Sequence, residues 1–99
     1  MEIKKEVIKV VILWNLKKKD YSIVGLHNAI KEIVLISEAS LFSLLNQLEN
    51  ENLISTYSKV EKGHTKKIYQ ITSLGSMRLD RFDKEYEMIL EVGKYIRRG

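Results

Sequence analysis

The chain has 99 residues, contains no cysteine and no proline, and carries a formal net charge of +4. This length suits a single domain, and the lack of cysteine excludes disulfide bonds, thiolate metal sites and cysteine nucleophiles, as suits a reducing cytoplasm. No apolar run approaches the roughly 20 residues that cross a bilayer. Paired carboxylates, a metal-ligand spacing and a phosphate-binding glycine loop are also missing from the sequence. We therefore expect a cytoplasmic protein that is not an enzyme and has no cofactor, metal or membrane partner.

Apolar residues at helical spacing predict three helices in the first half of the chain. The first runs over residues 2–17 and ends at a run of lysines. The second follows Ser22, a predicted N-cap, and continues to about residue 33. The third follows a second serine cap, Ser37, and buries leucines that recur at i, i+3, i+4 and i+7. Asn52 is expected to end this helix in the left-handed conformation, where asparagine often replaces glycine.

The spacing of apolar residues changes to every second position after the third helix. Residues 53–60 and 67–71 are therefore predicted to be strands, joined by a glycine-containing turn at 61–66. Three helices followed by a β-hairpin are the order of a winged helix-turn-helix, in which the third helix enters the major groove of DNA. We expect a mainly α fold with a small β-hairpin, with the winged helix-turn-helix at 1–72.

A heptad spacing of apolar residues follows the hairpin and predicts a long C-terminal dimerisation helix at 73–99, capped by Thr72. An exposed heptad needs a partner, so we expect this helix and the first helix to form a two-fold homodimer. The expected interface residues are Ile3, Val7, Trp14, Leu79, Phe82, Tyr86, Ile89, Leu90, Gly93 and Ile96.

Two motifs resemble the family of PadR-type regulators, the phenolic-acid decarboxylase regulators. The segment LFSLLNQLENENLI at 41–54 resembles the family's Leu-aromatic-x-x-Leu-x-x-Leu pattern with its acidic turn and apolar strand. The segment YQITSLG at 69–75 resembles the joint between the family's wing and C-terminal helix. The resemblance extends from Val10 to Gly75 and implies a dimeric bacterial transcription regulator. Some members of the family bind small aromatic or drug-like molecules near the dimer interface, so the resemblance also implies a possible ligand of this kind.

The sequence departs from the family pattern in three respects. Asp20 and Asn52 stand where glycines are usual, and Asn46-Gln47 occupies positions that are often basic. The first two changes leave the predicted fold intact. The third leaves the predicted recognition helix without positive charge, since no lysine or arginine occurs between residues 31 and 59.

The third helix, with its leucines inward, would present amides, small residues and one aromatic ring to DNA. Asn46 and Gln47 can each pair with an adenine edge through two hydrogen bonds, while Ala39 and Phe42 can contact a thymine methyl group. Positive charge would come from lysines clustered around the turn at 61–66. The alternative interpretation is that all of these are ordinary solvated positions. The expected DNA contacts are Tyr21, Ser37, Ala39, Ser40, Phe42, Ser43, Asn46, Gln47, Lys59, Lys62, His64, Lys66 and Lys67.

These features predict a sequence-specific transcriptional regulator that binds an A·T-rich palindrome in double-stranded DNA as a homodimer. Of the possible regulatory roles, we expect that of a repressor. Its affinity should be modest and fall steeply as salt rises. Two alternatives are a protein-interaction module with Phe42 as the hot spot and a plasmid or phage partition factor. Tyr21 can bind phosphate or anchor its turn. Trp14, Phe82 and Tyr86 can line a pocket for a small aromatic effector, although such aromatics more often pack in a core.

Overall fold

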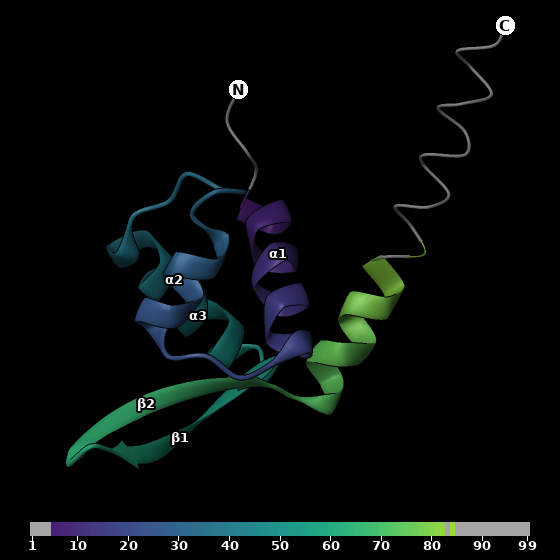
Figure 1. Cartoon of the computed structure of the whole chain (residues 1–99). Helices are drawn as coiled ribbons and strands as arrows, with labels where there is room; N and C mark the ends of the chain where they lie inside the picture. Colours follow the sequence, from purple (N-terminus) through teal and green to yellow (C-terminus); the bar gives the residue numbers. More distant parts are fainter. Residues whose placement is uncertain (1–4, 83, 85–99) are drawn as a thin grey trace, which may run out of the picture.

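A computed structural model of the chain describes residues 5–82 and 84 (Figure 1). The labelled elements are α1 (Lys5–Lys18), α2 (Ile23–Ile30), α3 (Glu38–Asn50), β1 (Ile54–Glu61) and β2 (His64–Ile71). A further helix follows β2 and is described over residues 73–82. This order confirms the predicted winged helix-turn-helix. The full length of the predicted C-terminal helix lies outside the described residues, as do the expected interface residues Ile3, Tyr86, Ile89, Leu90, Gly93 and Ile96.

Serine caps begin the second and third helices, as predicted. The Ser22 hydroxyl accepts a hydrogen bond from the Gly25 N–H at 3.2 Å, and the Ser37 hydroxyl accepts one from the Ser40 N–H at 3.1 Å. The predicted end of α2 was wrong, because α2 stops at Ile30 and residues 31–33 form a turn. The chain leaves the helical path there to bury Val34 in the core.

Asn52 ends α3 as predicted, with a φ of 63°. Its N–H donates to the Glu49 carbonyl at 3.0 Å, and the next N–H, of Leu53, donates to the Leu48 carbonyl at 3.0 Å. These two hydrogen bonds form a Schellman motif, which satisfies carbonyls at the helix end. Leu48 and Leu53 are both buried, so the motif also directs the chain from α3 into β1 beside the core.

The hairpin turn is shorter than predicted. It consists of Lys62 and Gly63 alone, and β2 begins at His64 instead of Lys67. Both turn residues have positive φ, 50° and 78°, as a two-residue type I′ turn requires. This turn matches the twist of the flanking strands, so pairing continues to its edge. Lys66 consequently lies in a strand and not in the turn.

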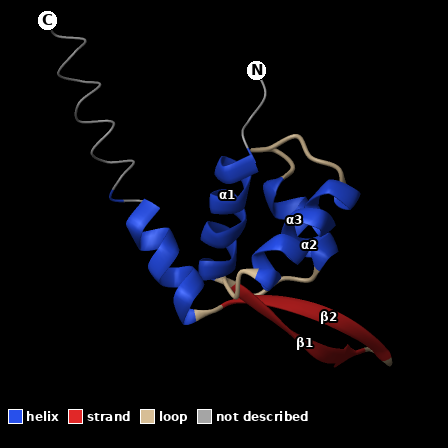
Figure 2. Cartoon of the chain, turned by 180° about the vertical axis from the view of Figure 1, so that it is seen from behind, coloured by secondary structure: helices blue, strands red, loops and turns tan. Residues whose placement is uncertain are grey.

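The core lies between the three helices and the base of the hairpin, with the helix at 73–82 beside α1 (Figure 2). It is built from aliphatic side chains of all three helices together with Tyr69 from β2. Leu79 is 1% exposed and belongs to this core. Its predicted place in a dimer interface is therefore wrong for the side chain, which has almost no free surface. None of the described helices is long and apolar enough to span a membrane.

The helix at 73–82 is joined tightly to the end of β2. The Thr72 N–H donates to the Leu53 carbonyl at 3.1 Å, and the Thr72 hydroxyl both donates to the Asn52 carbonyl at 2.7 Å and accepts from the Gly75 N–H at 3.0 Å. Thr72 is thus the predicted cap. A Cβ atom at Gly75 would overlap the Leu53 carbonyl oxygen, so this position requires glycine for close approach.

Candidate nucleic-acid interface

The outward face of α3 carries the residues expected to read DNA. Ala39, Ser43 and Asn46 are exposed, Phe42 is 47% exposed, and Gln47 is half-buried. The leucine stripe faces the core, as the spacing predicted. The side chains on this face are therefore small residues, two amides and one ring, without a charge. Their contact with DNA stays a prediction.

The start of α3 is held by a short serine network. The Ser37 hydroxyl donates to the Ser40 hydroxyl at 3.0 Å and also accepts from the Ser40 N–H. Both serines are exposed. The Ser40 hydroxyl keeps its own hydrogen for a further acceptor, so this end of α3 can still donate to a phosphate oxygen.

Tyr21 extends the hairpin by one backbone pair. Its N–H donates to the Tyr69 carbonyl at 3.2 Å, and the Tyr69 N–H donates back to the Tyr21 carbonyl at 2.8 Å. The Lys19 ammonium lies 4.9 Å from the centre of the Tyr21 ring. The half-buried Tyr21 thus anchors the connection between α1 and α2 to β2. These contacts favour the anchoring role over the predicted phosphate contact.

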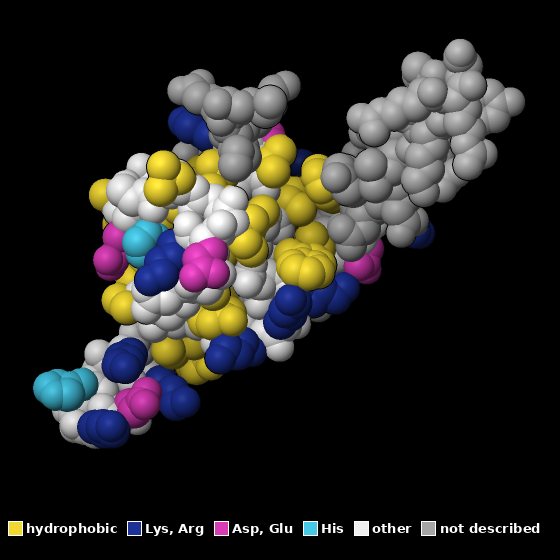
Figure 3. All heavy atoms as spheres, turned by 45° about the horizontal axis from the view of Figure 1, so that its top comes forward, with side chains coloured by type: hydrophobic (Ala, Val, Ile, Leu, Met, Phe, Trp, Pro, Cys, Tyr) yellow, Lys and Arg dark blue, Asp and Glu magenta, His cyan; other side chains and the backbone are white. Residues whose placement is uncertain are grey.

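The hairpin forms a basic wing that projects from the body of the protein. Figure 3 shows basic side chains gathered on it, with a histidine at its tip. The five expected DNA contacts on it are all exposed, namely Lys59, Lys62, His64, Lys66 and Lys67.

Two wing lysines lie directly opposite each other. Lys59 and Lys66 are cross-strand partners, an arrangement that is destabilising for like charges. Glu61 offsets part of the repulsion, because its carboxylate lies 3.7 Å from the Lys66 ammonium. Lys67 points to the other face of β2, where its ammonium lies 5.2 Å from the centre of the Tyr69 ring. The wing therefore presents positive charge on both faces.

A groove lies between α2 and β2 and is bordered by one residue of α3, and we call it the wing groove. It has a volume of about 590 Å³ and brings together Val24, Gly25 and Asn28 of α2, Phe42 of α3, and Lys66 and Lys67 of β2. The groove is mostly apolar, with the lysines on the β2 side. The structure thus unites Phe42 with two wing lysines, which the sequence had placed in separate elements.

A hydrogen bond that the sequence did not predict fixes the base of the wing. The Tyr57 hydroxyl in β1 donates to the Asp20 carboxylate at 2.8 Å. This hydrogen bond, with smaller contributions from desolvation and the negative charge of Asp20, raises the pKa of Tyr57 above its ordinary value. Asp20 stands where the family usually has glycine, so this chain gains a side-chain link between wing and helices.

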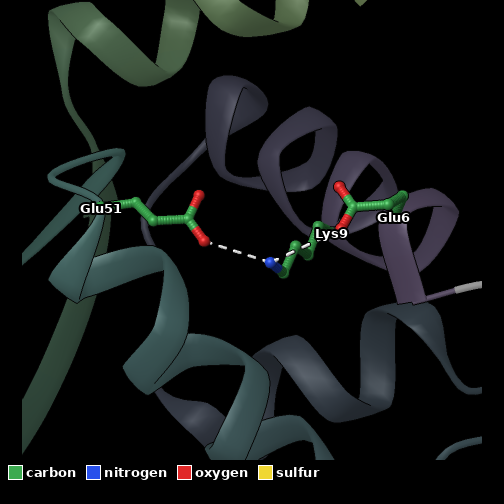
Figure 4. Close-up of polar contacts among 3 residues, drawn as sticks. All are labelled: Glu6, Lys9 and Glu51. Carbon is green, nitrogen blue, oxygen red and sulfur yellow. Dashed lines mark hydrogen bonds and ion pairs between the residues drawn. The ribbon is translucent and has the colours of Figure 1, made fainter.

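A second unpredicted contact fixes α3 against α1 (Figure 4). The Lys9 ammonium lies 3.1 Å from the Glu51 carboxylate and 3.8 Å from that of Glu6. The Lys9 side chain is only 13% exposed, so solvent screens this pair less than a surface pair. The end of α3 is therefore tied to α1 by charge as well as by apolar packing.

The first helix leaves apolar side chains exposed. Val7 is 43% exposed and Trp14 is 48% exposed, and Figure 3 shows hydrophobic side chains along this side of the protein. The Lys18 ammonium lies 3.9 Å from the centre of a Trp14 ring. A shared pocket of Trp14, Phe82 and Tyr86 stays a prediction, since Tyr86 lies outside the described residues. Phe82 lines a cavity of about 230 Å³ with Lys9, Arg78 and other residues.

Comparison with known proteins supports the same architecture. The chain is 36% identical over 58 residues to an uncharacterised protein of Lysinibacillus sphaericus, a match that covers 58% of this chain and 53% of that protein. The chain therefore spans about half the length of this curated relative.

Solved structures of similar fold include a PadR-like transcriptional regulator from Bacillus cereus, with a TM-score of 0.85, 24% identity and coverage of 96% of this chain and 95% of that chain. Bacillus subtilis PadR, whose structure was solved in complex with operator DNA, has a TM-score of 0.70 and 22% identity, with coverage of 77% of this chain and 46% of that chain. Both likenesses confirm the winged-helix fold. The model of the Transcriptional regulator PadR-like family matches residues 12–81, which is most of the chain. The chain belongs to the PadR-like family of transcriptional regulators.

Proposed function

We propose that this chain is a sequence-specific DNA-binding repressor that acts as a homodimer, with α3 in the major groove and the basic wing on the DNA backbone. The observation that carries the proposal is an uncharged, exposed face on α3 whose Phe42 borders the same groove as two wing lysines, Lys66 and Lys67. The fold is shared with Bacillus subtilis PadR, which was solved in complex with operator DNA, and this supports DNA as the partner.

Base recognition would rest on the amides of α3. Asn46 and Gln47 lie one position apart, and their side-chain amides can each accept and donate a hydrogen bond to an adenine edge. Ala39 and Phe42 offer apolar contacts to thymine methyl groups. An A·T-rich target is therefore expected. Each amide pair of this kind discriminates against the wrong base by about 1–3 kcal/mol.

Affinity would rest on the wing. The opposed Lys59 and Lys66 repel each other in the free protein, and a phosphate between them would replace that repulsion by two attractions. Binding through such contacts releases counterions from DNA. The logarithm of the binding constant should therefore fall against the logarithm of salt concentration by about 0.9 for each phosphate contact.

Dimerisation would come from the exposed side of α1 together with the C-terminal helix. Val7 and Trp14 are seven residues apart, so they lie on one face of α1, and both keep large exposed apolar surfaces. Covering them in a two-fold dimer would place two α3 helices in successive major grooves about 34 Å apart. The target should accordingly be palindromic. We assign a small aromatic effector to the cavity that Phe82 lines.

The experiment is selection of bound fragments from a random duplex pool, at low and at near-physiological salt. We expect an enriched A·T-rich palindrome that the Asn46→Ala variant no longer selects. Ser73→Ala, an exposed change at the start of the last helix, is the control and should select the same site. Salt-sensitive retention without any enriched sequence would overturn the proposal and favour a protein partner on Phe42.

A further inference from the structure

We infer that Lys5, at the start of α1, is the phosphate contact on the side of α3 opposite the wing. The inference rests on the proposed function and adds a residue that neither the sequence pattern nor the wing accounts for. A major groove is bordered by two phosphate backbones, and the inference concerns the one on the side of α3 away from the wing. Lys66 and Lys67 of the wing line the groove that borders α3 at Phe42, which is one flank of the helix.

The geometric basis is a second groove beside α3, which we call the α1 groove. It has a volume of about 340 Å³ and lies between Lys5 and Ile8 of α1 and Ser40, Ser43 and Gln47 of α3. With Ser37, which also lines it, four expected DNA contacts thus share the α1 groove with Lys5. The wing groove, by contrast, borders α3 at Phe42.

The two grooves flank the reading face of α3 on opposite sides. At 100° per residue, Ala39 and Asn46 point nearly the same way. Phe42 lies to one side of them and Gln47 to the other, so the outward residues form a ridge between the grooves. An α-helix with side chains is about 10–12 Å across, and the major groove is about 12 Å wide. A helix that fills the groove must therefore meet a phosphate backbone along each flank.

Charge on the two flanks comes from different elements. Lys66 and Lys67 line the wing groove, and Lys5 is the one charged residue among those that line the α1 groove within the described chain. No carboxylate of the described residues forms an ion pair with Lys5. Its ammonium is exposed on a flexible stem, which suits a phosphate contact. A recognition helix without basic residues thus has cations supplied from both neighbours.

The test measures DNA binding of the full chain against salt, over about 50–200 mM, on the duplex selected by the wild-type protein. Lys5→Ala should lower the slope of log K against log salt by about 0.9 per bound chain. At 0.1 M salt this corresponds to roughly eightfold weaker binding per chain, taking 1 M salt as the reference. The loss should be equal on matched and mismatched sequences, because a phosphate contact carries no base information.

Two further variants make the result specific. Lys31→Ala removes the same charge from an exposed position at the end of α2 and should leave the slope unchanged. Lys5→Arg keeps the charge and should restore the slope. In ethylation interference, Lys5→Ala should lose a phosphate contact that the wing variant Lys67→Ala retains. The lost contact should lie on the opposite DNA backbone from the one that Lys67→Ala affects.

The outcomes separate the two proposals. If the wild-type protein selects a sequence and Lys5→Ala keeps its full slope, the role of Lys5 is wrong while the repressor proposal stands. If the wild-type protein selects no sequence, both proposals fail. If Lys5→Ala and Lys31→Ala lower the slope equally, the effect is one of overall charge, and the assignment to Lys5 is overturned.

Discussion

Gly75→Ala tests the joint between the wing and the last helix. A Cβ atom at Gly75 would overlap the backbone carbonyl of Leu53 and lie 2.8 Å from a side-chain carbon of Ile71. The Leu53 carbonyl also accepts the Thr72 N–H, so it is not free to move aside. Forced overpacking of this kind costs about 1–3 kcal/mol or more. Alanine would regain about 1 kcal/mol through helix propensity.

Because the overlap is with backbone atoms, the cost should lie at the upper end of this range. The net expectation is therefore a loss of about 2 kcal/mol, a large fraction of the roughly 5–15 kcal/mol typical of a domain. Urea unfolding followed by circular dichroism gives this free energy directly, with an unchanged slope if only the native state is affected. DNA binding at a temperature where the variant is folded should also fall, because the helix at 73–82 must shift relative to β1.

Gly25→Ala is the matched control. Its Cβ would lie 3.3 Å from the Ser22 hydroxyl and 3.3 Å from the Tyr21 ring, a tight but adjustable contact with side chains. Here the helix propensity gain of about 1 kcal/mol should roughly balance the contact. Equal free energies for Gly75→Ala and the wild type would refute the claim that close backbone approach determines this position.

Three further predictions concern the wing and the end of α3. Glu61→Gln removes the carboxylate 3.7 Å from Lys66, so DNA should bind several-fold tighter and with a steeper salt slope; an unchanged slope, measured against Glu49→Gln, would contradict this. Tyr57 has a raised pKa in the folded protein, so its hydrogen bond to Asp20 stabilises the fold below the unfolded pKa of about 10, and this contribution disappears as pH rises through the folded pKa. Ultraviolet titration of the wild type should accordingly contain a tyrosinate step above the ordinary tyrosine pKa that is missing in Tyr57→Phe, and an unchanged titration in the variant apart from amplitude would refute the assignment. Asn52→Ala should cost about 1 kcal/mol in urea unfolding because φ is 63°, while Asn52→Gly should be nearly neutral; equal losses in both would mean that the asparagine side chain is what matters.

Features fixed by neighbouring residues could be predicted from the sequence. The serine caps, the asparagine at the end of α3 and the leucine stripe all depend on spacings of three to seven residues, and the order of elements then indicated the winged-helix fold. The hairpin turn could not be predicted in the same way. Lys62 adopts positive φ, which a lysine seldom does, so the turn was assigned too many residues.

The parts of the candidate site that lie on a single helix could be predicted from the sequence. Contacts between two elements could not. The outward face of α3 follows from its own periodicity. The contact between Asp20 and Tyr57 joins residues 37 positions apart, and that between Lys9 and Glu51 joins residues 42 positions apart. Lys5 likewise lies beside α3 only because α1 and α3 border the same groove. Such neighbours depend on tertiary geometry, for which a single sequence carries no local signal.

The wing has a consequence for solubility as well. One edge of β2 is covered by Tyr21 near the body, whereas β1 has no second partner strand among the described residues. A free strand edge is a template on which other chains can add, and lysines along it oppose such association. Lys59 and Lys62 lie on or beside this free edge. The lysines that would oppose association are therefore the same ones to which we assign contacts with the DNA backbone. Replacing these lysines with neutral residues should promote aggregation, and this would obscure any effect on DNA binding. Variants that move the charge to another position in the wing avoid this problem.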